Sequence, residues 1–274
     1  MAIDDLFERD LETFINDNTD PDALWLLLHI PKTAGSSLSA ELDLLMPPYR
    51  NIHLLDEHYR RTDLTGERFW AQLDPMIEAM IAEDADVHFR SASGHMWMRQ
   101  ANMIRDAIGR TKIFTFLRNP VRRIVSDYNY QGSQQHPAWE EFVTNYPTIE
   151  AYIENPAEHN KIYKYLRRTM DEPVDELIAR VRREFAFVGL VEMYPLSFNV
   201  LTRLFGLNHL PSQRVRTGRP DYQEISPEAR ARIIELNSLD LAIYEPFHAV
   251  MVAQRAAWQD LITADPGEVV AAEA

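Results

Sequence analysis

The chain has 274 residues, of which 46% are hydrophobic and 26% charged, and this composition excludes a disordered protein. Its net charge of −14 argues against a general nucleic-acid or anionic-membrane binder, because such proteins need a basic face. The absence of cysteine excludes a disulfide framework and a thiolate metal site. No apolar run approaches the roughly 18 residues of a membrane span, so we expect no transmembrane segment and a cytoplasmic protein.

Apolar runs of strand length alternate with helical patterns in the first half of the chain. The run ALWLLLHI is continuous, as expected of a buried parallel strand. In chain order, the patterns predict helix Asp5–Phe14, strand Ala23–Ile30, helix Leu38–Met46, helix Arg68–Glu83, strand Val87–Ser93, helix Gln100–Ile108 and strand Lys112–Leu117.

The second half is mainly helical. The patterns predict a helix from Pro120 through Tyr130, mostly helix over 137–184, strand Phe185–Val191, a helix to Phe205, loop Leu210–Tyr222, and helices Pro227–Leu236 and Ser238–Leu261. Strands separated by helices indicate an α/β protein, a three-layer sandwich with a mainly parallel sheet. We expect one domain at 23–260, an acidic N-terminal extension at 1–22 and a flexible tail at 261–274.

The first strand ends in a loop that suits an anion. The sequence His29-Ile-Pro-Lys-Thr-Ala-Gly-Ser-Ser-Leu38 leads directly into a helix, whose free N–H groups and positive dipole end favour phosphate or sulfate. Lys32 adds a positive charge, and Gly35 would let the backbone approach closely. An ordinary capped helix start is the alternative. Because Lys32 precedes the only glycine, the loop is not a Walker A motif, which argues against a nucleotide or sugar kinase.

A second motif follows the strand Lys112–Leu117. In FLRNPVRRIVSDY, Arg118 leaves the strand and Ser126 lies about two helical turns later, so both can reach one phosphate. A surface salt bridge is the alternative for Arg118. In this order, the two motifs resemble those of the carbohydrate-type sulfotransferases, which include heparan sulfate 2-O-sulfotransferase. Asn119 stands where that family often has Asp, and we expect it to cap the helix equally well.

The resemblance implies a P-loop-like sulfotransferase fold that uses 3′-phosphoadenosine 5′-phosphosulfate (PAPS), releases adenosine 3′,5′-bisphosphate (PAP) and needs no metal. It implies that the donor is bound by Lys32, Thr33, Ala34, Gly35, Ser36, Ser37, Arg118 and Ser126, and that Arg216 and Thr217 close over it. A solvated basic loop is the alternative for the last two. Weaker likenesses lie at Ser93-Gly94-His95, at Phe187-Val-Gly-Leu-Val-Glu192, and at Asn237, Asp240 and Tyr244.

Two residues are predicted to be catalytic. Lys32 would neutralise charge on the leaving group, and His95, just past a strand's carboxyl end, would be the general base. His53 and Glu57 are the alternative bases. The acceptor is expected to be a hydroxyl of a carbohydrate, glycolipid or small metabolite in a cleft lined by residues 46–90 and 131–184. A catalytically silent nucleotide-binding module is the non-enzymatic alternative, and an oligomer is compatible with the sequence.

Overall fold

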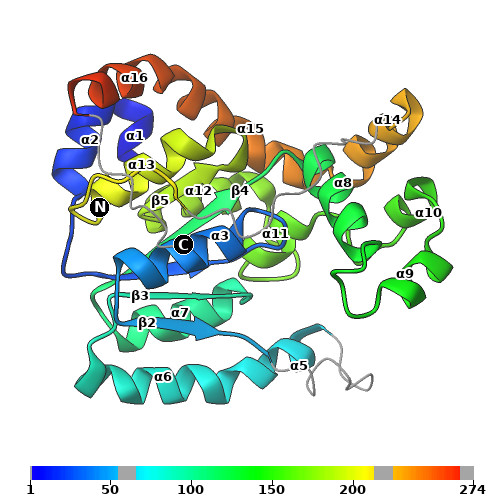
Figure 1. Ribbon diagram of the computed structural model, residues 1–274, viewed down its shortest axis with the longest axis horizontal. Helices are drawn as coiled ribbons and strands as arrows, with labels where there is room; N and C mark the ends of the chain where they lie inside the picture. Colours follow the sequence, from blue (N-terminus) through cyan, green and yellow to red (C-terminus); the bar gives the residue numbers. More distant parts are fainter. Residues whose placement is uncertain (1, 55–65, 213–224, 266–274) are drawn as a thin grey trace.

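The computed structural model describes residues 2–54, 66–212 and 225–265. Within them, a five-stranded parallel sheet has the order β2-β3-β1-β4-β5 (Figure 1). The strands are β1 (Leu24–Leu28), β2 (Tyr49–Ile52), β3 (Ser91–Gly94), β4 (Thr111–Leu117) and β5 (Phe187–Leu190). Because all the strands are parallel, their carboxyl ends meet at one edge, where ligand sites of open α/β sheets form.

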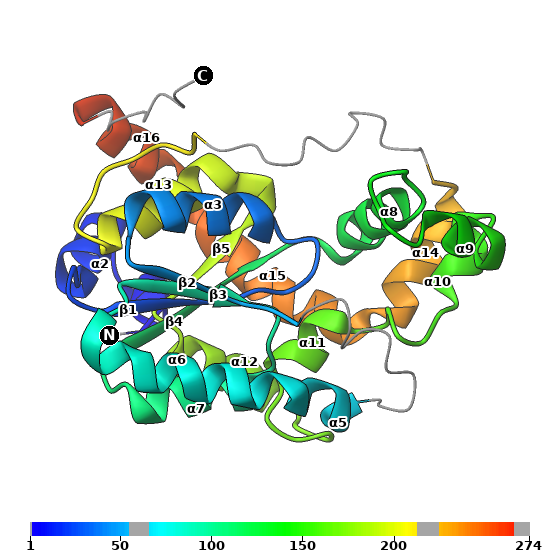
Figure 2. The same ribbon diagram turned by 60° about the horizontal axis from the view of Figure 1, so that its bottom comes forward.

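Helices cover both faces of the sheet, which confirms the predicted three-layer α/β fold. Figure 2 shows α3 (Gly35–Leu45) and α13 (Tyr194–Leu204) on one side, and α6 (Asp74–Val87), α7 (Met98–Ala107) and α12 (Val174–Glu184) on the other. The chain also forms α1 (Asp5–Glu8), α2 (Leu11–Asn18), α5 (Gly66–Trp70), α11 (Lys161–Leu166), α15 (Ser238–Ala253), α16 (Arg255–Ala264) and 3-10 turns at Ala71–Leu73 and Val191–Met193.

The main core lies around β1, all five of whose residues are buried. Its Trp25 is fully buried and packs against Phe205 and Phe114, with ring centroids 4.8 and 6.3 Å away. A strand covered on both faces must be apolar throughout, which explains the continuous LWLLL run. The core therefore fixes the strand that leads into the predicted anion-binding loop.

A second, smaller core lies among four helices beyond the end of β4. These are α8 (Pro120–Gln131), α9 (Trp139–Asn145), α10 (Ile149–Ile153) and α14 (Pro227–Leu236), grouped at one end of the molecule in Figure 1. Val125 and Ile124 of α8 pack there with Tyr152 and Ile233. One face of α8 is thus fixed by these helices.

The structure differs from the predicted elements at the N-terminus. Asp10 accepts a hydrogen bond from the Thr13 N–H and caps a new helix, so the predicted helix Asp5–Phe14 is split into α1 and α2. Leu6, Leu11 and Phe14 of this acidic segment are buried in the main core, because they form an apolar stripe among the acidic residues.

Three further boundaries differ. Strand β2 was missed because its sequence YRNI is polar and it lies at the edge of the sheet. Helix α6 runs on through Val87 and ends at the left-handed His88, so the strand predicted from Val87 begins only at Ser91. The predicted helix Ser238–Leu261 is broken at Gln254 into α15 and α16.

Candidate functional site

The loop between β1 and α3 has an unusual backbone. Lys32 and Ala34 both adopt left-handed conformations, with φ of 69° and 66°. Such a conformation costs a non-glycine residue about 1–3 kcal/mol and is typically kept at functional sites. Left-handed residues in a loop turn neighbouring N–H groups toward a common point, which suits an anion. Among the described residues, no side chain caps the N-terminus of α3, so its first N–H groups remain available to a ligand.

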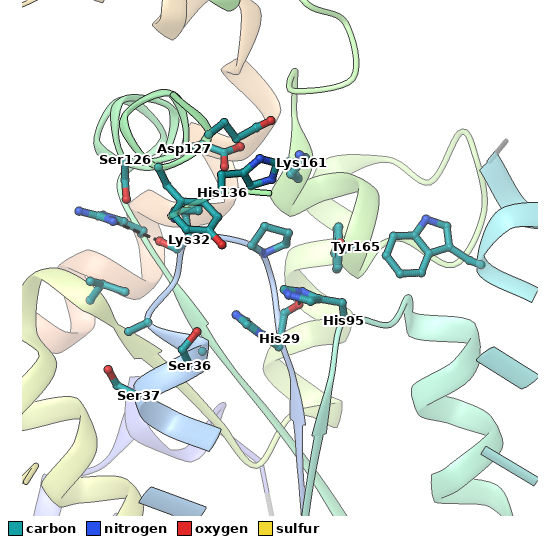
Figure 3. Close-up of a pocket in the computed structure, with 18 of the residues that line it drawn as sticks. His29, Lys32, Ser36, Ser37, His95, Ser126, Asp127, His136, Lys161 and Tyr165 are labelled. Atoms are coloured by element: carbon teal, nitrogen blue, oxygen red, sulfur yellow. Dashed lines mark hydrogen bonds between the residues drawn. The ribbon is translucent and has the colours of Figure 1, made fainter. Parts of the chain in front are cut away.

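A cavity of about 710 Å³ opens beside this loop, within the ~300–1,000 Å³ range of small-molecule sites (Figure 3). It is lined by most of the residues predicted from the two motifs, which are Lys32, Ala34, Gly35, Ser36, Ser37, Arg118 and Ser126, and by the predicted base His95. Thr33 does not line it, because its hydroxyl is turned inward and donates a 2.8 Å hydrogen bond to the Ile30 carbonyl. Thr33 therefore holds the loop's shape.

The two motifs touch each other. Arg118 Nη1 donates a hydrogen bond of 3.3 Å to the carbonyl oxygen of Lys32. Asn119 accepts hydrogen bonds from the N–H groups of Val121 and Arg122, which confirms its predicted role as the cap of α8. Ser126 then enters the cavity from the same helix. The cationic loop and the arginine–serine pair therefore line the same cavity.

Glu192 holds the start of α8 in place. Its carboxylate accepts a hydrogen bond from the Asn119 N–H at 3.0 Å and one from the Tyr244 hydroxyl at 3.3 Å. This gives a structural role to two of the weaker sequence likenesses, those at Glu192 and at Tyr244. Both support the turn that carries Arg118.

His95 lies at the carboxyl end of β3 and is set up as a hydrogen-bond acceptor. Its Nδ1 lies 3.0 Å from the backbone carbonyl oxygen of His29. Since a carbonyl can only accept, Nδ1 carries the proton and Nε2 keeps its lone pair. The pKa of His95 is lowered to about 4, mainly because the ring is buried. The hydrogen bond to His29 raises this pKa, and the charges of Lys161 and Lys32 lower it further. The ring is therefore neutral at physiological pH.

The His29 side chain connects the loop to His95. The two imidazole rings are stacked, with centroids 3.9 Å apart and planes inclined by 25°. On its other side the His29 ring fills the space at Gly35, where a Cβ atom would lie only 1.8 Å from His29 Nε2. The sequence suggested that Gly35 serves close approach of an anion. The structure gives a second reason, since only glycine leaves room for His29.

Lys32 is held over an aromatic ring. Its Nζ lies 3.9 Å from the ring centroid of Tyr130, which belongs to α8 and also lines the cavity. The face of an aromatic ring attracts a cation, so Tyr130 orients the ammonium within the cavity. The contact adds a second link between the loop and α8.

Sequence reasoning did not single out several cavity residues. Lys161 and Tyr165 come from α11, Asp127 from α8, and His136 from the segment after it. His136, Lys161 and Tyr165 lie within 131–184, and Phe69 and Trp70 lie within 46–90, the two segments expected to line the acceptor cleft. No recognisable motif surrounds Lys161 or His136, so only their segment, and not the residue, was predictable.

One predicted alternative is not brought to this cavity. His53, an alternative base, follows β2 with an exposed side chain and is not among the described residues that line the cavity. Glu57, Arg216 and Thr217 lie outside the described residues. Within the described ranges, no group of three or more His, Asp or Glu side chains forms a metal site. None of the helices described has both the length and the hydropathy of a membrane span.

Comparison with known protein families gives a family assignment. The model of the Sulfotransferase family matches residues 18–247. A sulfotransferase structure from Alicyclobacillus acidocaldarius covers 88% of this chain and 99% of its own, with 17% identity and a TM-score of 0.49. The mouse sulfotransferase SULT7A1 complexed with PAP covers 83% and 69%, with 12% identity and a TM-score of 0.34. No curated protein matches the chain significantly. The resemblance predicted from the motifs is confirmed by the family match.

Proposed function

Because the chain belongs to the sulfotransferase family and is thus an enzyme of the PAPS-dependent class, we propose that it transfers a sulfonate group from PAPS to an acceptor hydroxyl in the 710 Å³ cavity. One observation carries the proposal. Lys32, Arg118 and His95, from three separate parts of the chain, line the same cavity, and Arg118 contacts the Lys32 carbonyl. These residues provide the charge and the base that the reaction requires.

The donor would lie along the loop and α8. The chemistry of these residues fits a doubly phosphorylated nucleotide: an ammonium and helix N–H groups at one end, a guanidinium and a hydroxyl at the other. We assign the phosphosulfate end to Lys32 and to Gly35, Ser36 and Ser37, and the 3′-phosphate to Arg118 and Ser126. PAPS supplies an activated sulfonate with PAP as the leaving group. No metal ion is required in this scheme.

His95 is proposed as the general base. Its Nε2 lone pair would accept the proton of the acceptor hydroxyl as the new oxygen–sulfur bond forms and the bond from sulfur to the leaving phosphate oxygen breaks. The His29 carbonyl keeps the required tautomer, and the lowered pKa keeps the ring unprotonated. Lys32 would stabilise the negative charge that develops on the leaving phosphate.

The acceptor would bind at the aromatic side of the cavity. Phe69, Trp70 and Tyr165 line this part, and their rings suit a sugar ring or another flat apolar face. We therefore propose a carbohydrate, glycolipid or small hydroxyl-bearing metabolite. A cytoplasmic location for the reaction is part of the proposal.

The test is transfer of label from ³⁵S-PAPS to a panel of hydroxyl acceptors, with donor hydrolysis to PAP measured in parallel. Lys32→Ala and His95→Ala should each lower turnover by about 10²–10⁴-fold. Lys112→Ala is the control, because Lys112 lies near Asp20 rather than at the cavity. A melting shift with PAP but no transfer or hydrolysis would indicate a silent binding module instead. Full activity of His95→Ala at saturating donor would exclude His95 as the base.

A further inference from the structure

Helix α11 begins at Lys161, whose position is fixed by a buried hydrogen-bond network. Asp240 accepts hydrogen bonds from the N–H groups of Ile162 and Tyr163 at 3.0 and 2.8 Å. The N–H of Asn160 donates to Asn237 at 2.9 Å. The side-chain oxygen of Asn160 in turn accepts from the N–H groups of Leu239 and Asp240 at 3.0 and 3.3 Å. The residues before and after Lys161 are therefore hydrogen-bonded to the first turn of α15 and to its cap, Asn237.

Asn160 itself has a left-handed backbone, with φ of 46°. Asp240 is fully buried, and Asn237 is 1% exposed. A strained turn and a buried carboxylate both cost free energy, so they are kept where the local geometry matters. Asn237 and Asp240, which carried one of the weaker sequence likenesses, thus have a structural role: they fix the start of α11.

The Lys161 ammonium pairs with the carboxylate of Glu158. Glu158 in turn is bound by the fully buried guanidinium of Arg123. Arg123 donates a hydrogen bond of 2.9 Å to the Glu158 backbone carbonyl, and its Nη1 lies 3.4 Å from the Glu158 carboxylate. Burial alone would raise the pKa of Glu158, but Lys161 and Arg123 lower it to about 2. Burial, with the charge of Glu158, raises the pKa of the neighbouring Asp127 and favours its protonated form. Two cations thus face one fixed carboxylate.

This network positions a second lysine, Lys161, in the cavity that also contains Lys32 and His95. The Lys161 side chain is 17% exposed and is one of the residues that line the cavity (Figure 3). The pKa of His95 is lowered more by the charge of Lys161 than by that of Lys32. Lys161 therefore acts on the group that would meet the acceptor.

We propose that Lys161 is a second catalytic lysine, whose ammonium contacts the sulfonate oxygens during transfer while Lys32 serves the leaving phosphate. The inference rests on the proposed function. The transferring sulfonate is anionic, and a cation already fixed by Glu158 needs no reorganisation to stabilise it. Because Lys161 contacts the sulfonate and not the nucleotide in this scheme, its loss should affect the rate of transfer and not the affinity for PAP, which lacks the sulfonate.

The experiment compares Lys161→Met with Lys164→Met, the matched control. Lys164 lies on the same helix, but its ammonium bonds to the Pro156 carbonyl at 2.7 Å and it is not a cavity residue. We expect Lys161→Met to lower kcat for ³⁵S-PAPS transfer and hydrolysis by about 10²-fold. PAP affinity by calorimetry should change by less than about 3-fold, and Lys164→Met should match the wild type.

A pH profile separates this role from a structural one. Loss of the Lys161 charge raises the pKa of His95, so the acid limb of the rate profile should move toward neutral pH. Lys161→Arg keeps the charge, so its acid limb should stay near that of the wild type. The other titratable or charged groups lining the cavity with His95 are His29, Lys32, Arg118, Asp127, Tyr130, His136 and Tyr165, and all are unchanged in these variants.

Each other outcome decides against the inference. Equal rates for Lys161→Met and Lys164→Met would show that Lys161 has no catalytic role. A loss of PAP affinity as large as the loss of rate, with an unmoved acid limb, would assign Lys161 to donor binding or to the fold. If Lys161→Met does not fold, the pH profile of Lys161→Arg serves as the test and is compared with that of His29→Ala. An acid limb of Lys161→Arg that moves toward neutral pH as far as the limb of His29→Ala would also overturn the inference. A wild type that neither binds PAP nor hydrolyses PAPS would instead refute the proposed function itself.

Discussion

Replacing Gly35 with alanine would bring a methyl group into steric overlap with the imidazole ring of His29. The added Cβ would lie 1.8, 2.0 and 2.1 Å from three atoms of that ring. Since non-bonded carbons settle at ~3.5–4.0 Å, the ring must move by about 1.5–2 Å. His29 stacks on His95 at 3.9 Å, so the displacement is passed on to the proposed base.

The expected cost has two parts. Overpacking a buried site costs about 1–3 kcal/mol, and about 2 kcal/mol corresponds to a fall of roughly 4–8 °C in Tm for a chain of this size. A displacement of about 1 Å at the reacting groups lowers turnover by about 10²-fold. Gly109→Ala is the control, because no atom of the described residues lies within 4 Å of a Cβ at that position.

A double-mutant cycle identifies His29 as the cause. In a His29→Ala background the methyl group has room, so adding Gly35→Ala should cost less than about 0.5 kcal/mol in a thermal or denaturant melt. Both proteins carrying His29→Ala should also bind PAP equally. If Gly35→Ala costs as much stability and PAP affinity without His29 as with it, the glycine is required by the donor and our reasoning is wrong.

Four further predictions concern the site and its supports. His95 is neutral above a pKa of about 4, so kcat/KM should fall only as pH drops through about 4, and a limb near 6.5 would contradict this. In the unfolded chain His95 binds its proton near pH 6.5, whereas in the folded protein it stays neutral down to about pH 4. The free energy of unfolding should therefore decrease as the pH is lowered from 6.5 to 4, and Tm measured against pH checks this. Arg118→Ala should weaken PAP binding by about 2–4 kcal/mol in calorimetry, and unchanged affinity would refute the 3′-phosphate assignment. Asp240→Ala leaves the Ile162 and Tyr163 N–H groups without an acceptor and should cost about 2–4 kcal/mol in denaturant unfolding, with Asp240→Asn milder.

The strands with a clear pattern were predictable. The apolar runs around Leu24–Leu28, Thr111–Leu117 and Phe187–Leu190 became β1, β4 and β5 because a strand buried on both faces must be apolar. The polar edge strand β2 carried no such signal. The turn at His88 was equally invisible, since its left-handed conformation follows from the end of α6.

The cavity residues of the two sequence motifs were also predictable. Lys32, the residues Ala34–Ser37, and the pair Arg118 and Ser126 were identified from the order and spacing of the motifs and from their resemblance to the sulfotransferases, and all of them line the cavity. The capping role of Asn119 follows from its place beside Pro120.

The tertiary structure decided which side chains meet those motifs. The His29 and His95 rings stack because β1 and β3 are neighbours in the sheet, which no sequence spacing states. Lys161 reaches the cavity because Asn160 is bonded to Asn237, 77 positions later in the chain. The sequence by itself determined the local backbone that can hold an anion. Contacts between distant segments decided which histidine and which second lysine line the same cavity, because only the folded chain brings those segments together.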